Sequence, residues 1–164
     1  MSNMDALVEE AAKKAAVAWI AVAGNPPTLA WCAWLGGALL VVTGEGEQAI
    51  PGLAEADTAE VILRGDHGGR IVTFPADVTR IAPQDEAWTE LVPQLAAKRL
   101  NSSGAADDLV RRWAERCVVS RLTPAGASAD MPDDAQAAPP RPTPATRIPR
   151  RPFRLHKVRG ARGR

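Results

Sequence analysis

Apolar positions in the first sixteen residues recur three and four apart, which is the period of an α-helix. Ser2 or Asn3 can cap the start, and Lys13 and Lys14 lie where cations favour a helix end. The pattern therefore predicts a helix over residues 4–16. Its apolar face consists of Leu7, Val8, Ala11, Ala12 and Ala15.

From residue 17 the helical period disappears, and short apolar segments alternate with turn residues. Residues 17–23, 28–34 and 38–43 are apolar, and Asn-Pro-Pro and Leu-Gly-Gly sequences separate them. Segments this short between turns favour strands over helices. Trp31 and Trp34 are three positions apart, so they are expected on opposite faces of one strand, with both faces covered.

Two more strands follow a Gly-rich loop. Residues 60–64 and 70–81 form the predicted pair, and the Gly-rich residues 65–69 form the hairpin turn between them. Pro75 lies inside the second strand, and because proline donates no backbone hydrogen bond it predicts an edge position or a bulge there.

Residues 85–100 return to helical spacing, and Pro93 is expected either to kink this helix or to start a second one. A further helix around Trp113 and a strand over residues 118–122 complete the order. The order is one helix, about five strands, two helices and a strand, with hairpin-length loops. It predicts a mainly β, α+β fold: a small antiparallel barrel with flanking helices.

The uncharged run of 30 residues from Ala15 to Gly44 could suggest a membrane span. Turn residues divide it into pieces shorter than the roughly 20 residues a bilayer requires. Acidic residues near the N-terminus also cancel the positive region of an export signal. Cys32 and Cys117 lie in apolar surroundings without metal-ligand spacing, so reduced thiols are expected. We therefore expect a cytoplasmic protein without a membrane partner.

Charge separates the chain into two parts. Residues 1–123 hold 11 basic and 16 acidic side chains, whereas residues 124–164 hold 9 basic and 3 acidic ones. Eight of the 14 prolines also lie after residue 123. We therefore expect a folded domain over residues 1–123 and a disordered, Pro-rich, basic tail over residues 124–164. Such a tail is a candidate contact for nucleic acid, although a solvated tail explains the composition equally well.

Several sequence segments together resemble a known superfamily. Residues 42–48 (Val-Thr-Gly-Glu-Gly-Glu-Gln), Pro51-Gly52-Leu53, and the strand pair 61–64 and 69–74 are among them. Helices bearing Trp88 and Trp113 before a final strand complete the set. Over about residues 5–123 the chain resembles the pyridoxamine 5′-phosphate oxidase-like, FMN-binding split-barrel superfamily, and in particular its small actinobacterial members.

This resemblance implies a six-stranded antiparallel split β-barrel that forms a homodimer, with FMN or a deazaflavin in a groove at the dimer interface. Thr43, Arg64 and Arg70 are the implied phosphate contacts on the strands. Lys98 and Arg99 are further cofactor-binding candidates from the neighbouring subunit. The chain contains no Tyr, in contrast to the oxidases proper, which argues against pyridoxamine phosphate oxidation.

Each candidate also has a purely structural interpretation. Arg64 and Arg70 could be exposed hairpin ends paired with nearby carboxylates, and Lys98 and Arg99 suit the C-terminal end of a helix. The loop at residues 43–48 lacks the Lys and Ser/Thr of a phosphate-binding loop. It is expected either to be a turn across the barrel mouth or to lie beside the ligand or the dimer partner, and Glu47 and Gln48 are its candidate polar residues.

Two functions therefore remain open. One is a flavin- or deazaflavin-dependent oxidoreductase that transfers hydride through its cofactor to a small molecule. The other is a cofactor-free split-barrel dimer that acts as a binding or adaptor module, with the basic tail as a contact arm. His67 lies in a Gly-rich turn and His156 in the expected tail, so no metal site or catalytic triad can be assembled from them.

Overall fold

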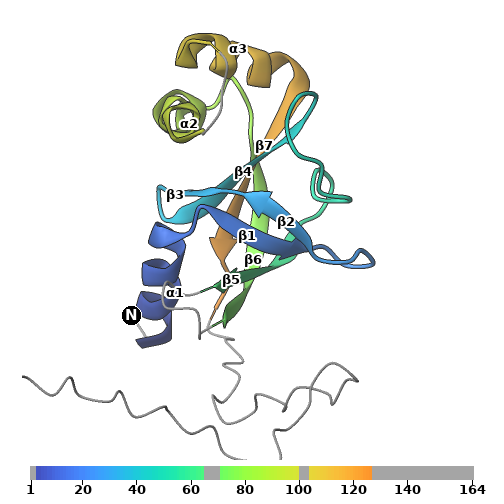
Figure 1. Ribbon diagram of the computed structural model, residues 1–164, viewed down its shortest axis with the longest axis vertical. Coiled ribbons are helices and arrows are strands. Elements are labelled where there is room, and N and C mark those ends of the chain that lie inside the picture. The colour runs from blue at the N-terminus through green and yellow to red at the C-terminus, as the bar shows by residue number, and fades with distance from the viewer. Residues whose placement is uncertain (1–2, 65–70, 100–103, 127–164) are drawn as a thin grey trace, which may run out of the picture. The chain divides into compact units, whose positions relative to one another are not determined.

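The computed structural model describes residues 3–64, 71–99 and 104–126, and structural statements below concern these residues. Three helices and seven strands follow one another (Figure 1). The helices are α1 (Asn3–Lys14), α2 (Glu86–Lys98) and α3 (Ala106–Arg116). The strands are β1 (Val17–Ala21), β2 (Thr28–Trp31), β3 (Ala33–Leu35), β4 (Ala38–Gly44), β5 (Thr58–Arg64), β6 (Ile71–Ile81) and β7 (Cys117–Pro124).

All seven strands belong to one antiparallel sheet with the order β2-β1-β5-β6-β7-β4-β3. Its two outermost strands, β2 and β3, are consecutive in the chain and only Cys32 separates them. This link brings the two edges of the sheet together and nearly closes it into a barrel. The strands β2 and β3 correspond to the single predicted strand 28–34. Counted as one, they reduce the seven strands to six, and the expected split barrel is confirmed.

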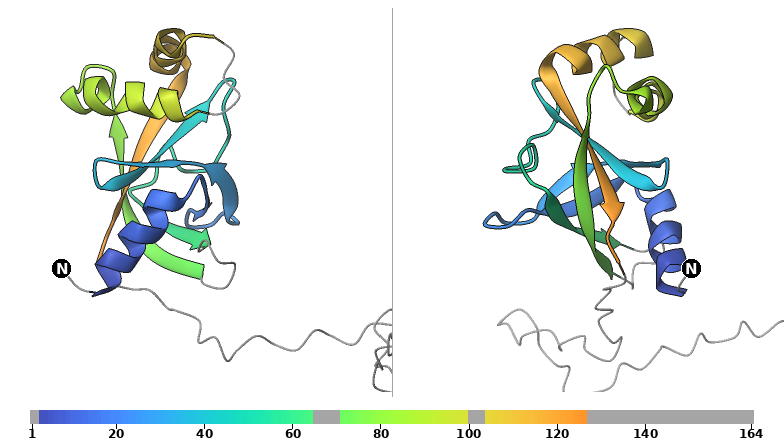
Figure 2. Two further views of the ribbon diagram at one scale, coloured as in Figure 1. Left: turned by 60° about the vertical axis from the view of Figure 1, so that its left-hand side comes forward. Right: turned by 180° about the vertical axis from the view of Figure 1, so that it is seen from behind.

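The strands separate two hydrophobic cores. The inner core fills the barrel and includes Leu39 and Val41 of β4, with Val8 and Ala12 of α1 packed on it. The outer core lies between the barrel and helices α2 and α3, and includes Leu40. Figure 2 shows the two helices together at one end and α1 apart from them. Because β4 is covered on both faces, its apolar run shows no alternation.

The two tryptophans of the predicted strand 28–34 do point to opposite faces. Trp31 packs against the outer core, under the helices, whereas Trp34 packs against the inner core. Cys32 interrupts the strand between them, but it does not change this alternation. The prediction that both faces of this part of the sheet are covered is confirmed at these two positions.

Pro75 lies in β6, which is a central strand with β5 and β7 on its two sides. The Pro75 carbonyl accepts a hydrogen bond from Ala125 N at 2.9 Å, so the ring nitrogen also faces the β7 side. Pairing with β7 ends there, at Ala76 opposite Pro124. The prediction of an edge strand is therefore wrong, since β6 lies inside the sheet. Pro75 is tolerated there because its missing N–H falls where pairing with β7 ends.

Helix α2 continues through Pro93, which is exposed, so the alternative of a second helix starting there is wrong. No described helix is both long enough and apolar enough to cross a membrane. The chain divides into Met1–Asp134 and Ala135–Arg164, and the second unit lies outside the described residues. The predicted hairpin turn at 65–69, Arg70 and nearly all of the basic tail lie outside them too. A nucleic-acid contact by that tail therefore stays a prediction.

Candidate functional site

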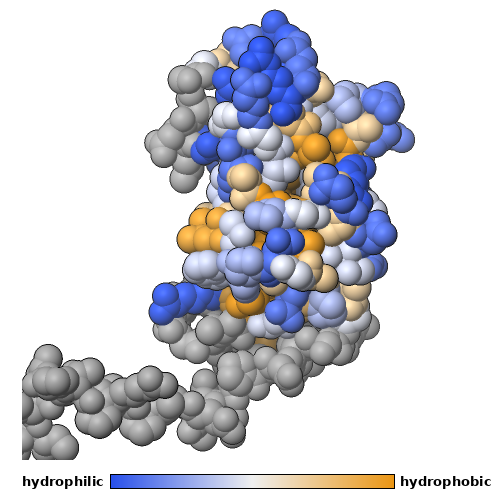
Figure 3. All heavy atoms as spheres, turned by 90° about the vertical axis from the view of Figure 1, so that its right-hand side faces the viewer, coloured by the Kyte–Doolittle hydropathy of each residue, from blue (hydrophilic) through white to orange (hydrophobic). Residues whose placement is uncertain are grey.

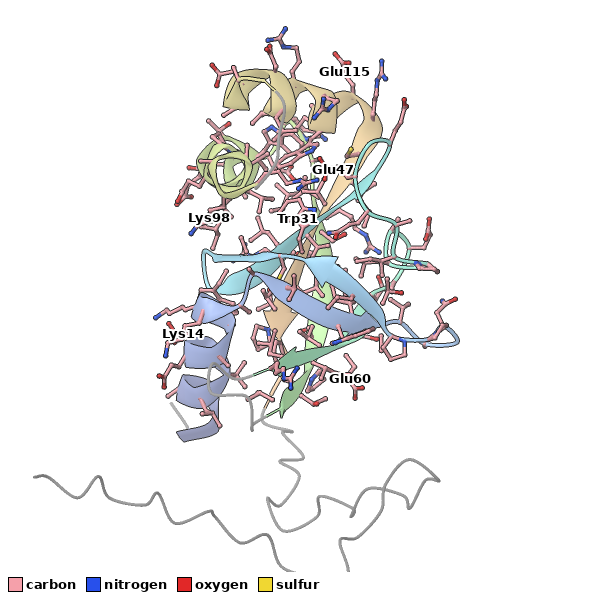
Figure 4. All side chains as sticks on the ribbon, in the orientation of Figure 1. Lys14, Trp31, Glu47, Glu60, Lys98 and Glu115 are labelled. Atoms are coloured by element: carbon pink, nitrogen blue, oxygen red, sulfur yellow. The ribbon has the colours of Figure 1, made fainter. Side chains whose placement is uncertain are left out.

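The loop after β4 carries a carboxylate into the space between the barrel and the helices. Glu47 accepts hydrogen bonds from Arg99 Nε at 3.1 Å and from Trp113 Nε1 at 3.0 Å. Only 2% of the Glu47 side chain is exposed, compared with 25% of the Arg99 side chain. Figure 4 shows the labelled Glu47 and Trp31 between the barrel and the two helices. Glu47 and Arg99 thus form a largely buried ion pair, and the Trp113 indole N–H is a second, neutral donor to the same carboxylate. Removing one partner of such a pair is costly, because it leaves the other charge without compensation.

Two aromatic rings complete this cluster. The rings of Trp31 and Trp113 stack with centroids 6.1 Å apart and an interplanar angle of 29°. The Arg99 guanidinium carbon lies 5.0 Å from the Trp31 ring centroid, within the range of a cation–π contact. We call Trp31, Glu47, Arg99 and Trp113 the junction cluster. It joins β2, the loop after β4, the end of α2, and α3.

The loop itself is fixed at several points. Gln48 receives a hydrogen bond from Trp31 N at 2.8 Å and donates one to Trp31 O at 2.9 Å, so its amide pairs with an edge strand as a neighbouring strand would. Gly44 has φ +141°, and a Cβ there would lie 2.5 Å from the Arg116 carbonyl oxygen. Gly44 therefore allows the close approach to β7 that directs Glu47 inward.

Neither thiol in the described region is activated. Burial raises the pKa of Cys32 to about 12, at the junction of β2 and β3. Burial and, secondly, the nearby Glu47 carboxylate raise the pKa of Cys117. Both cysteines are free of disulfides, as expected. Since the reactive form of cysteine is the thiolate, these shifts argue against nucleophilic or redox chemistry at either residue.

The predicted cofactor residues do not converge on one point. Thr43 is 8% exposed and pairs with Val118 in β7, whereas Val119 pairs with Ile81 at the end of β6. Arg64 is exposed and pairs with Ile71 at the start of β6. The 11 residues of β6 therefore separate Arg64 from Thr43, which corresponds to about 33 Å along an extended strand.

The two candidates at the end of α2 have different surroundings. Lys98 is exposed, and Figure 4 shows it apart from Glu47 and Trp31. Arg99 lies within the junction cluster, where it contacts Glu47 and the Trp31 ring. Of the described candidates, only Thr43 and Arg99 lie near the same loop, since Thr43 forms a β-bridge with Gln48.

A second feature lies on the same outer face of the β1–β2 hairpin as Trp31. Val17, Trp19 and Leu29 are 52%, 48% and 49% exposed. Trp19 pairs with Leu29, and Val17 pairs with Trp31, so these four side chains share one face. We call Val17, Trp19 and Leu29 the exposed hairpin face. Figure 3 shows hydrophobic residues, in orange, at the surface in the middle of the molecule between more polar ends.

Sequence reasoning missed one polar side chain that organises the barrel mouth. Arg80 of β6 donates to the carbonyl of Ala54 at 2.8 Å, to that of Leu53 at 3.2 Å, and to that of Ala56. It thereby holds the loop that leads into β5. An arginine next to the last residue of β6 was the available signal, but a distant backbone partner has no sequence pattern.

No family model matches the sequence, and no curated protein matches it either. Solved structures do. HutZ, the heme storage protein from Vibrio cholerae, is 12% identical with a TM-score of 0.53, covering 77% of this chain and 93% of that one. A candidate pyridoxamine 5′-phosphate oxidase from Listeria innocua is 12% identical with a TM-score of 0.51, covering 77% and 98%. The conserved hypothetical protein Rv2991 from Mycobacterium tuberculosis is 16% identical with a TM-score of 0.54, covering 77% and 82%.

The chain has the fold of the pyridoxamine 5′-phosphate oxidase-like split barrels. The resemblance inferred from the sequence is thus confirmed at the level of the fold. At identities of 12–16% these structures show the fold alone, since a heme storage protein and a candidate oxidase share it and a fold does not fix a function.

The described residues of this split barrel fit the ring of a flavin better than its phosphate. The exposed hairpin face offers an indole on which a flat ring could stack. The phosphate candidates are spread over both ends of β6, and Arg99 already contacts a carboxylate. Within the described residues no group of three or more His, Cys, Asp or Glu side chains could hold a metal ion.

Proposed function

We propose that this protein is a homodimeric split-barrel binding protein whose ligand is a flat, conjugated ring of the flavin class, FMN or a deazaflavin, held at the subunit interface. The exposed hairpin face carries the proposal. Three large apolar side chains, each about half exposed, share one sheet face. Soluble monomers seldom expose contiguous apolar surface, and such patches mark binding sites.

A two-fold dimer would place this face against its own copy, because isologous interfaces pair the same patch on both subunits. Trp19 would then supply either the interface contact or the surface against which a flat ring lies. Of the described phosphate candidates, Arg64 and Lys98 have exposed side chains that a ligand could reach. A bound flavin would supply hydride transfer.

A cofactor-free binding or adaptor dimer is the second candidate. It is favoured by one specific observation, the pairing of Arg99 with a carboxylate of its own chain. In this case the exposed hairpin face serves only self-association or a protein partner.

One purified sample separates these candidates. Light scattering at several concentrations gives the oligomeric state, and the visible spectrum with titrations of FMN, riboflavin and a deazaflavin gives ligand binding. A dimer that binds one of these rings supports the leading proposal. A dimer that binds none at tens of micromolar supports the adaptor, and a monomer that binds none contradicts both.

A further inference from the structure

The junction cluster has the donor set of an anion-binding site. A guanidinium N–H and an indole N–H converge on the two oxygens of one carboxylate, at 3.1 and 3.0 Å. Donors of this kind bind carboxylates and phosphates through charge-assisted hydrogen bonds. The sequence analysis names Arg99 as a candidate for such a contact, and in the structure its guanidinium already contacts the Glu47 carboxylate.

That anion belongs to the chain itself. Glu47 is 52 residues from Arg99 and 66 from Trp113, so the contact is a product of the fold and not of a local helix end. The loop backbone holds it in place, because Gln48 is bonded at both ends of its amide to Trp31. The indole N–H of Trp31 is also buried and has no partner among the described residues.

We propose that Glu47 is the resident anion of this site and that its carboxylate closes the site to small oxyanions such as phosphate. Removal of the carboxylate would leave Arg99 and Trp113 as converging donors in a space of carboxylate size. The Arg99 side chain is 25% exposed, so an ion from solvent can reach the guanidinium. This proposal does not depend on flavin binding, since it concerns the junction cluster and not the exposed hairpin face.

The test measures thermal unfolding of Glu47→Ala in inorganic phosphate against sodium chloride at equal pH and ionic strength. We expect the wild-type midpoint to be the same in both salts. The midpoint of Glu47→Ala should rise by roughly 5 °C when phosphate reaches ten times its dissociation constant. The double variant Glu47→Ala/Arg99→Met should lose this response, because the guanidinium is gone.

The matched control is Glu45→Ala. Glu45 lies in the same loop and also pairs with an arginine, Arg116, at 3.1 Å, but its side chain is 73% exposed. It should show no phosphate response. If Glu47→Ala does not fold, Glu47→Ser replaces it, because its short side chain also leaves the carboxylate space empty, with the Trp113 indole N–H resonance as the readout of phosphate binding.

Three results would overturn the proposal: an equal phosphate response in the wild type, no response in a folded Glu47 variant, or a response that survives the loss of Arg99. Each is independent of whether the protein binds FMN or forms a dimer.

Discussion

Trp31 and Trp19 lie on the same face of one β-hairpin, yet the two ends of that face have opposite surroundings. At Trp31, α3 supplies a stacked indole, the C-terminal end of α2 supplies a guanidinium, and the loop after β4 supplies a buried carboxylate. At Trp19 the described residues supply only Leu29 and Val17 beside it, and the indole remains half exposed. The chain therefore covers the Trp31 end of this face with its own helices, whereas the Trp19 end stays exposed among the described residues.

The largest expected effect lies at the covered end. Trp113→Ala removes a side chain that is 0% exposed and should lower the free energy of unfolding by about 4 kcal/mol. It also removes the indole donor to Glu47. Urea unfolding measures the change, and Trp113→Phe should recover most of the packing but not the hydrogen bond. A loss below about 1 kcal/mol would show that the cluster does not hold the helices to the barrel.

The next effect separates charge from packing in the same cluster. Glu47→Ala should cost about 2 kcal/mol, because it leaves the partly buried guanidinium without its carboxylate. The value is less than for a fully buried pair, since Arg99 retains contact with water. Urea unfolding of Glu47→Ala beside Glu45→Ala checks it, and Glu45→Ala should change the free energy by less than about 0.5 kcal/mol. Equal costs for the two variants would contradict the distinction.

At the exposed end the effect should appear in association and not in folding. Trp19→Thr should raise the dissociation constant of the proposed dimer about tenfold, since truncated interface aromatics commonly cost more than 1 kcal/mol. Unfolding of the monomer should change by less than about 0.5 kcal/mol. Light scattering across a dilution series measures the first, and Asp107→Asn on the exposed start of α3 is the control. An unchanged dissociation constant would show that the exposed hairpin face is not the dimer interface.

The smallest effect concerns the inside of the barrel beneath the hairpin. The Cys32 pKa is about 12 in the folded chain and 9.0 as a reference value. Above pH 9 the unfolded chain releases this proton first, so stability falls as pH rises toward 12. At pH 10 the wild type should lose about 1 kcal/mol more than Cys32→Ala, relative to pH 7. Parallel pH curves for the two proteins would show that Cys32 is not shielded from water.

The sequence by itself determined the local elements and much of their arrangement. Helical spacing located α1 and α2, and short apolar segments between turns located the strands, because these periods follow from the backbone of each segment alone. The three-residue separation of Trp31 and Trp34 also sufficed to place them on opposite faces. The sequence also pointed to Arg99 of the junction cluster, but it did not predict the pairing of Arg99 with Glu47.

Only the tertiary structure decided the state of the charged residues. Lys98 and Arg99 are neighbours in sequence, yet one is exposed and the other contacts Glu47, 52 residues away. The family resemblance implies that Arg64 and Thr43 both contact a phosphate, yet they lie near opposite ends of β6. The physical reason is the difference in sequence separation over which the two kinds of interaction act. Backbone periods act between residues a few positions apart, whereas ion pairs and aromatic stacks depend on which strands and helices meet after the barrel has closed.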